Sequence, residues 1–184
     1  MEIVVGITGA TGSIYAVRLL EALKENGVYT HLIMSHWAKE NTVVEAKYSL
    51  DYLEGLAAEV HDNKNLGART SSGSYVTDGM VVVPCSMKTL SSIANGYCEN
   101  LISRSADVTI KEGRKLVICP RETPLSPIHL KNMLCLAEIG VKIVPPMPAF
   151  YNNPSSIDDI VNHHVMKLLD QFGINNANGK RWDG

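Results

Sequence analysis

Aromatic residues, long apolar runs and an excess of one charge are all scarce in this sequence. Phe, Trp and Tyr make up 6% of the 184 residues, and 17 basic residues nearly offset 19 acidic ones. The net charge of −2 gives no reason to expect nucleic acid or an anionic membrane as a partner. No apolar run approaches the roughly 20 residues that a membrane-spanning helix needs, and no basic, cleavable leader precedes the first apolar run. We therefore expect a cytoplasmic protein.

Cysteine is also sparse and unpaired in sequence. Cys85, Cys98, Cys119 and Cys135 form no C-x-x-C motif, and three of the four lie in or beside apolar runs. This pattern predicts buried free thiols rather than a metal site.

Residues 3–15 are the most informative stretch that is present. An apolar run leads into a turn rich in Gly, Thr and Ser, with the spacing Gly6-x-x-Gly9-x-x-Gly12. This is neither the dinucleotide motif G-x-G-x-x-G nor an NTP-binding loop, because no Lys-Ser/Thr pair follows it. Ser35 also stands where a dinucleotide enzyme would place a ribose-binding carboxylate. The stretch predicts a phosphate-bearing ligand without an adenosine ribose, such as FMN; a plain strand-to-helix turn is the alternative.

Apolar runs alternate with helical patterns along the whole chain. Strands are predicted at residues 3–7, 28–34, 80–83, 116–119 and 141–144. Helices are predicted at 15–25, 37–48, 50–58, 89–94, 101–111, 128–139 and 156–172, with a polar loop at 61–79. This alternation predicts an α/β fold, a doubly wound parallel sheet in three layers of the Rossmann or flavodoxin type. Residues 1–174 are expected to form this single domain, and 175–184 a tail that closes over the site.

Polar loops follow each predicted strand. They comprise residues 8–13, 35–37, 84–89, 120–123 and 146–151. Parallel doubly wound sheets bind ligands outside the carboxyl ends of their strands. The binding site is therefore predicted to be built from these loops.

Motifs in and beside these loops resemble one known family. They are T-G-A-T-G at 8–12, S-G-S at 72–74, P-C-S-M-K-T-L at 84–90, N-L-I-S-R-S-A-D-V at 100–108, P-R-E-T-P at 120–124, I-H-L-K-N-M-L at 128–134, F-Y at 150–151 and R-W at 181–182. In this order and spacing they are similar to the UbiX family of flavin prenyltransferases, long described as aromatic-acid decarboxylases. The resemblance extends from residue 3 to residue 182.

The resemblance implies a specific reaction. It implies transfer of a dimethylallyl group from dimethylallyl monophosphate to N5 and C6 of reduced FMN, which yields prenylated FMN for a partner aromatic-acid decarboxylase. It also implies a homododecamer with sites at subunit interfaces. The Mg²⁺-binding motif D-D-x-x-D of other prenyltransferases is missing, because Ile160, Val161 and Asn162 follow Asp158-Asp159. A metal-independent enzyme would neutralise the monophosphate with side chains.

The family's site residues can be placed on this sequence by motif. The resemblance implies FMN contacts from Gly9, Ala10, Thr11, Ser35, Ser86, Met87, Lys88, Thr89 and Arg121. It implies that Tyr151 and Lys167 hold the dimethylallyl phosphate together with Lys111 and Arg104, that Glu45 and Glu122 are the acidic site residues, and that Trp182 covers the pocket. Lys167 replaces the commoner Arg, which keeps the charge and loses the bidentate fork; Thr11 replaces Ser and keeps a hydroxyl.

Simpler interpretations stand beside these. Lys111, Lys167 and Glu45 fit a solvated surface, Glu122 fits a helix start, and Trp37 fits the core. Two other functions also fit the fold. One is an FMN-dependent decarboxylase with His36 as its base; the other is a non-catalytic FMN carrier, for which Lys111, Tyr151 and Lys167 would be surplus.

Overall fold

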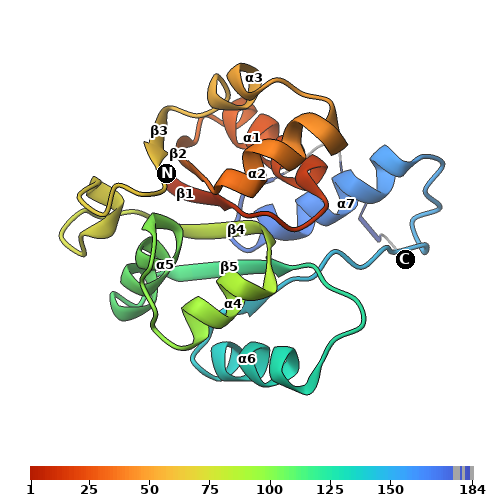
Figure 1. The fold of residues 1–184 in the computed structure, drawn as a ribbon. Coiled ribbons are helices and arrows are strands. Elements are labelled where there is room, and N and C mark those ends of the chain that lie inside the picture. Colours follow the sequence, from red (N-terminus) through yellow and green to blue (C-terminus); the bar gives the residue numbers. More distant parts are fainter. Residues whose placement is uncertain (176–178, 180, 183–184) are drawn as a thin grey trace.

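Six parallel strands form one sheet. The computed structural model describes residues 1–175, 179, 181 and 182. Its strands are β1 (Glu2–Ile7), β2 (Tyr29–Met34), β3 (Glu59–Asp62), β4 (Gly79–Cys85), β5 (Lys115–Pro120) and β6 (Lys142–Ile143). Their order across the sheet is β3-β2-β1-β4-β5-β6 (Figure 1). This is the order of a doubly wound Rossmann-type sheet, so the predicted α/β fold is confirmed.

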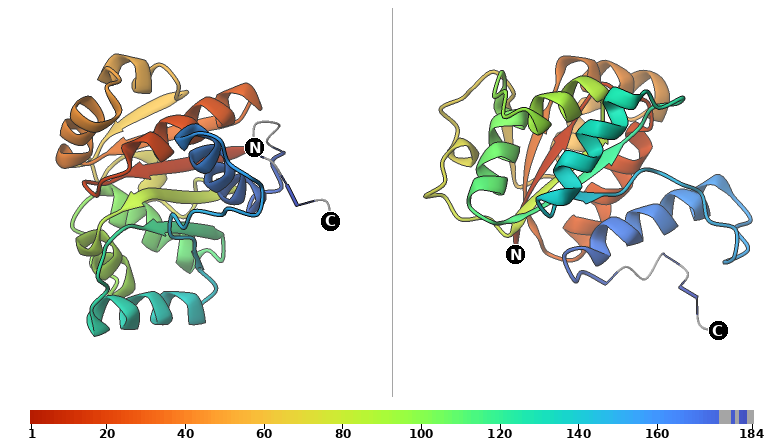
Figure 2. Two further views of the ribbon diagram at one scale, coloured as in Figure 1. Left: turned by 90° about the vertical axis from the view of Figure 1, so that its right-hand side faces the viewer. Right: turned by 90° about the horizontal axis from the view of Figure 1, so that it is seen from below.

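Helices cover both faces of the sheet (Figure 2). They are α1 (Ser13–Glu25), α2 (His36–Asn41), α3 (Leu50–Glu54), α4 (Met87–Ala94), α5 (Leu101–Lys111), α6 (Pro127–Glu138) and α7 (Ile157–Asp170), with a π-helix η1 (Thr42–Ala46) and a 3₁₀-helix η2 (Arg69–Ser71). One core includes side chains of α1 and α7, and the other includes side chains of α4, α5 and α6. Among the described helices, none is long and apolar enough to cross a membrane.

The alternation of β1 explains the two cores. Ile3, Val5 and Ile7 pack into the core with α1 and α7, whereas Val4 packs into the core with α4 and α5. Successive side chains of a strand point to opposite faces, and both faces are covered here. A central strand of a doubly wound sheet is therefore apolar throughout.

Three predicted elements need correction. The helix predicted at 50–58 ends at Glu54 as α3. The sequence predicted five strands and a loop from residue 61, but β3 is a sixth strand at the edge of the sheet, paired only with β2 among the described residues. Its residues alternate between half-buried and exposed and include only one apolar side chain, Val60. The helix predicted at 37–48 ends at Asn41, continues as the π-helix η1, and stops at Lys47, whose φ is 58°.

The helix predicted at 156–172 is confirmed as α7, with its capping box. The Ser156 hydroxyl accepts from the Asp159 amide at 3.1 Å, and the Asp159 carboxylate accepts from the Ser156 amide at 3.0 Å. Asp158 and Asp159 therefore lie in the first turn of a helix, as predicted.

Candidate functional site

A cavity of about 350 Å³ lies at the carboxyl ends of β1, β2 and β4. It is lined by Thr8, Gly9, Ser35, His36, Trp37, Asn63, Ser86, Lys88, Thr89, Ser92 and Asn100. The order of the strands reverses between β1 and β4, and ligands of doubly wound sheets bind at this point. The cavity therefore lies where the sequence predicted the site.

Hydrogen bonds of Thr8 hold the ends of β1 and β4 together at the base of the cavity. Its hydroxyl donates to the Pro84 carbonyl at 2.8 Å and accepts from the Ser86 amide at 2.7 Å. Ser86 in turn is the N-cap of α4, where its hydroxyl accepts from the Thr89 amide at 3.4 Å. The positive N-terminal end of α4 is thus fixed beside the cavity, with Lys88 in its first turn.

The loop between β1 and α1 is held by residues that follow β2. A Cβ added to Gly9 would lie 2.4 Å from the Cβ of Trp37, so only glycine fits this position. The Asn41 side chain donates to the Gly9 carbonyl at 3.0 Å. The Gly12 amide donates to the Glu45 carboxylate at 2.9 Å, because η1 brings Glu45 to the N-terminus of α1.

Five of the nine predicted FMN contacts line this cavity. They are Gly9, Ser35, Ser86, Lys88 and Thr89. Ala10 and Thr11 belong to the same loop as Gly9, and Met87 packs against the core beneath α4. Arg121 is exposed just after β5, and its amide donates to the Cys85 carbonyl at 3.1 Å. Hydroxyls, a helix N-terminus and a lysine are groups that suit the phosphate and polar ring edge of FMN.

Other cavity residues were missed by the sequence analysis or interpreted differently. Asn63, Ser92 and Asn100 were missed. Asn63 follows the unpredicted strand β3, and Asn100 is the N-cap of α5. Trp37 was expected in the core by default, but 66% of it is exposed and it lines the cavity.

Predicted substrate residues form a second group on the segment that leads into α7 and on α7 itself. The Tyr151 hydroxyl lies 3.2 Å from Nε2 of His163, and the Trp182 ring stands edge-on to Tyr151 with centroids 5.9 Å apart. Figure 1 shows this segment extending from the side of the sheet where the strands end. Lys167 Nζ lies 3.6 Å from the Asp170 carboxylate.

The described part of the C-terminal tail folds back onto α7. Arg181 donates to both oxygens of Asp170, at 3.0 and 2.6 Å, and its hydrogen bonds hold the pKa of that carboxyl below the usual range. The tail predicted at 175–184 also includes residues 176–178, 180, 183 and 184, which lie outside the described residues.

None of the four predicted catalytic residues lines the cavity of its own chain. Glu45 binds the Gly12 amide beside it, and the other three lie elsewhere. Lys111 is the last residue of α5 and lies near the amino end of β5. Its ammonium group forms an ion pair with Glu112. Arg104 donates to the Ser71 carbonyl at 3.2 Å and to Asp107 at 2.8 Å. Glu122 is exposed beyond β5, and its carboxylate accepts from the Thr123 amide at 2.9 Å.

The cysteines are all free, and two of them are buried. Burial raises the pKa of Cys85, and that of Cys119 to about 12. Cys98 is half-buried and Cys135 exposed, which corrects the expectation of four buried thiols. His164 faces Cys119, with Nε2 3.2 Å from Sγ, and burial lowers the pKa of this imidazole to about 4. Neither buried thiol is activated as a nucleophile at neutral pH.

A second hollow of about 380 Å³ lies at the opposite edge of the sheet. Its lining includes Arg114, Lys115 and Lys142, at the amino ends of β5 and β6. Sheets of this type bind their ligands at the carboxyl ends. The cavity beside Thr8 is therefore the candidate active site.

Known proteins match this chain over its full length. A model of the flavoprotein family matches residues 1–169. Flavin prenyltransferase LpdB of Lactiplantibacillus plantarum is 58% identical over 184 residues, which cover 100% of this chain and 98% of that protein. The chain belongs to the UbiX-like flavin prenyltransferases. The sequence resemblance is thereby confirmed.

Solved structures of UbiX-like proteins agree closely with the fold of this chain. A dodecameric FMN-dependent UbiX-like decarboxylase from Escherichia coli O157:H7 has a TM-score of 0.98 and 54% identity, with 100% of both chains covered. AnUbiX (PadA1), solved with FMN and dimethylallyl pyrophosphate, has a TM-score of 0.98 and 48% identity, with 100% of this chain and 97% of that chain covered. Peptidyl-cysteine decarboxylase EpiD, at 20% identity and a TM-score of 0.62, shares the fold alone.

Proposed function

We propose that this protein is a flavin prenyltransferase. It joins a dimethylallyl group from dimethylallyl monophosphate to N5 and C6 of reduced FMN and releases phosphate, and its product serves a partner aromatic-acid decarboxylase. The observation that carries the proposal is the polar cavity between the ends of β1 and β4, in a chain that matches a flavin prenyltransferase over its whole length.

FMN is assigned to the cavity beside Thr8. The flavin supplies the nucleophilic ring atoms when bound, so the protein needs no reactive Ser or Cys. Its phosphate is assigned to Ser86, Met87, Lys88 and Thr89 at the start of α4, because amides and a cation converge there. Gly9, Ala10, Thr11, Ser35 and Arg121 are assigned to the remaining contacts.

The dimethylallyl phosphate is assigned to Tyr151 and Lys167, with Trp182 as the cover. A hydroxyl and an ammonium group suit the charge that develops on a departing phosphate. Glu122 and Glu45 are assigned as the acidic residues of the site, and a carboxyl of this kind can hold or return a proton. The tail from residue 175 is assigned the closure of this site, as Trp182 beside Tyr151 suggests.

Lys111 and Arg104 are assigned to the site of a neighbouring copy. Lys111 lies near the amino end of β5, whereas the cavity lies at the carboxyl ends, so it serves a site only through assembly. The E. coli relative is dodecameric. We propose the same homododecamer here, and the apolar side chains that α6 exposes support it: Ile128, Leu130 and Leu134.

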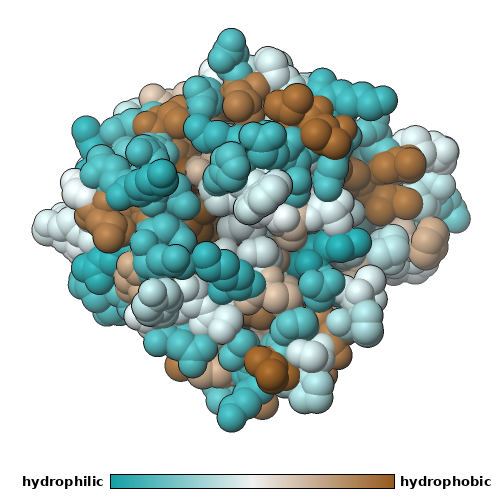
Figure 3. Space-filling model, in the orientation of Figure 1, coloured by the Kyte–Doolittle hydropathy of each residue, from teal (hydrophilic) through white to brown (hydrophobic). Residues whose placement is uncertain are grey.

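Figure 3 shows one face of the molecule, where hydrophobic side chains interrupt the hydrophilic surface in separate places, including over α6 at the lower edge.

The four free cysteines support a reducing compartment, so we propose the cytoplasm.

The deciding experiment is anaerobic incubation with reduced FMN and dimethylallyl monophosphate, without added metal, followed by mass analysis of the flavin. We expect a flavin heavier by one C₅H₈ unit. A parallel reaction with dimethylallyl pyrophosphate tests which donor is preferred. Unchanged flavin on folded protein that retains FMN would refute prenyl transfer with these donors.

A decarboxylase is the second candidate, because His36 lines the cavity. An imidazole beside a flavin can act as the base of such an enzyme. CO₂ release from aromatic carboxylic acids by the protein with FMN, and its loss in His36→Asn, would support this function over prenyl transfer. A protein that binds FMN but catalyses neither prenyl transfer nor decarboxylation would instead be a non-catalytic FMN carrier.

A further inference from the structure

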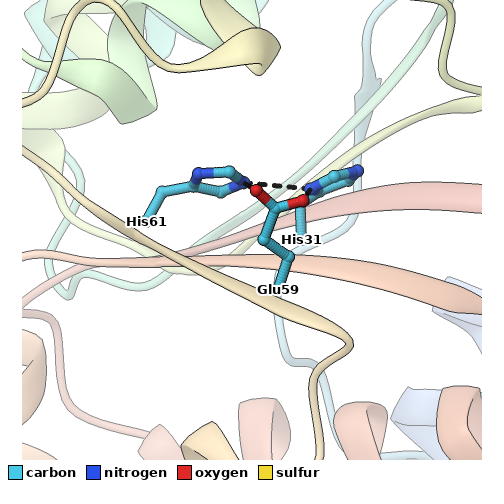
Figure 4. A group of neighbouring side chains, drawn as sticks. All are labelled: His31, Glu59 and His61. Atoms are coloured by element: carbon cyan, nitrogen blue, oxygen red, sulfur yellow. Dashed lines mark hydrogen bonds and ion pairs between the residues drawn. The ribbon is translucent and has the colours of Figure 1, made fainter.

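Three side chains that do not line the cavity converge on one face of the neighbouring strands β2 and β3. The register of β2 and β3 pairs His31 with Glu59 and Ile33 with His61. Because alternate residues of a strand share a face, Glu59 and His61 lie on the same face as His31. Figure 4 shows the Glu59 carboxylate and the two imidazoles directed toward one another.

The ligand atoms of these side chains have the spacing of a metal site. His31 Nδ1 lies 2.9 Å from His61 Nε2 and 3.5 Å from a Glu59 oxygen, and His61 Nε2 lies 3.8 Å from the other Glu59 oxygen. Ligand bonds of about 2.0–2.1 Å in a tetrahedral zinc site place the ligand atoms about 3.3 Å apart. The three observed separations, two of which end on different oxygens of Glu59, lie on either side of that value.

The surroundings orient His31 as a metal ligand would be oriented. Its Nε2 lies 2.6 Å from the Glu2 carboxylate, which also accepts from the Tyr75 hydroxyl. When Nε2 donates to Glu2, the lone pair of Nδ1 points to His61 and Glu59. A carboxylate behind a histidine fixes its tautomer in this way at many metal centres.

We propose that His31, His61 and Glu59 bind a divalent transition-metal ion of the zinc class, with the fourth position open to water. Two imidazoles and one carboxylate are a donor set that such ions prefer.

One positive group opposes a cation at this position. Arg69 Nε lies 3.6 Å from the Glu59 carboxylate, but its side chain is half exposed and can turn toward solvent. Glu2 and Glu59 supply the compensating negative charges.

The ion has a structural role. His31 is four residues before Ser35, about 13 Å along an extended strand, so the metal does not reach the reacting groups. It ties the edge strand β3 to the interior strand β2. Asn63, which lines the cavity, follows His61 by two residues, so the tie also positions one wall of the site.

The test uses the untagged full chain, treated with EDTA and dialysed into metal-free buffer near neutral pH. We expect calorimetry to give one Zn²⁺ per chain at this site. At a hundredfold excess over Kd, the Tm is expected to rise by about 5–10 °C. Co²⁺ in place of Zn²⁺ is expected to give the visible absorption bands of a tetrahedral ion. None of these readouts depends on prenyl transfer.

Variants locate the ion. His61→Gln and Glu59→Gln are expected to weaken Zn²⁺ binding by at least about 100-fold, and Glu2→Gln by about 10- to 100-fold. His129→Gln is the control, because His129 fills a capping-box position of α6 that Gln also suits. Absence of Zn²⁺ binding by the unaltered protein, or equal affinity in His61→Gln, would overturn the proposal, as would loss of binding in His129→Gln alone.

Discussion

Gly9 has no space for a side chain, because an added Cβ would lie 2.4 Å from the Cβ of Trp37. Gly9→Ala must therefore displace either the loop or α2, and both line the proposed flavin site. We expect FMN affinity to fall at least about tenfold, equivalent to about 1.4 kcal/mol, with unchanged far-UV circular dichroism. Flavin fluorescence titration measures this loss.

A second glycine provides the matched control. A Cβ on Gly67 would meet its nearest atom, in the exposed Asn65 side chain, at 3.3 Å. Gly67→Ala is expected to bind FMN like the unaltered protein. Equal affinity in both variants would show that the contact between Gly9 and Trp37 does not shape the site.

Lys167 tests the assignment of the phosphate site. Its ammonium is half exposed and lies 3.6 Å from Asp170, so it is available to a second anion. Lys167→Ala is expected to raise KM for dimethylallyl monophosphate about tenfold, whereas Lys167→Arg retains the charge and the affinity. Steady-state kinetics distinguish them, with the exposed Lys131→Ala as control. An unchanged KM in Lys167→Ala would remove this residue from the site.

Cys85 tests whether the chemistry needs a thiol. It is fully buried, and burial raises its pKa, so no thiolate forms at neutral pH. Cys85→Ala is expected to keep kcat within about threefold of the unaltered enzyme, at some cost in stability from the small cavity. Loss of turnover while FMN remains bound would contradict a purely structural thiol.

Single residues were predictable from sequence where the chemistry was local. Gly9, Ser35 and Ser86 line the cavity because they directly follow strands whose ends meet at one edge. Trp37 was harder, because its exposure depends on how α2 packs against Gly9. Lys111 was expected at the site by resemblance alone, and within the chain it pairs with Glu112 near the amino end of β5.

At the scale of elements, five strands were predicted, including the short edge strand β6, and the edge strand β3 was missed. The strands β1, β4 and β5 are largely apolar because helices cover both faces, and β2 ends in the apolar run Leu32-Ile33-Met34. β3 exposes alternate residues, so its sequence resembles a loop. The π-helix η1 has no sequence signal of its own; it forms where Glu45 reaches the N-terminus of α1.

The packing of α7 predicts how stability depends on pH. Burial lowers the pKa of His164 to about 4, from the 6.5 expected when unfolded. Between these values the unfolded chain binds a proton that the native imidazole does not, so stability falls as pH decreases from 6.5 toward 4. The loss from pH 7 to pH 5 is about 2 kcal/mol for this group.

Urea unfolding at both pH values measures this loss. His164→Gln removes the titrating group and is expected to flatten the dependence over the same range, although its stability at pH 7 falls because a contact with Cys119 is lost. A variant that loses as much stability on acidification as the unaltered protein would assign the effect to other groups.

At the scale of the whole molecule, the alternation of strands and helices sufficed to predict the doubly wound sheet. Parallel strands need crossover connections, and helices on both faces provide them. The surface of α6 was not interpretable in the same way. Only Leu136 of α6 is buried in the single chain. The spacing of its exposed apolar residues along the sequence is the same as that of residues on a helix that faces the core.

The proposed assembly would account for this surface and gives a test. Leu134 is 59% exposed in the single chain, so Leu134→Glu costs little within the chain but places a charge in a subunit interface. We expect light scattering after size exclusion to show smaller assemblies for this variant and an unchanged mass for Lys64→Glu, which adds the same residue on the exposed loop after β3. A dodecamer of Leu134→Glu would exclude α6 from the interface.

The bond between Glu45 and the Gly12 amide has a thermodynamic consequence. The turn at the start of α1 is already ordered before any ligand enters, since Asn41 and Glu45 satisfy its backbone groups. Ligand binding then costs little loop entropy. Calorimetry of FMN binding should accordingly show a heat-capacity change that matches the flavin surface buried, without the larger change that accompanies the folding of a disordered loop.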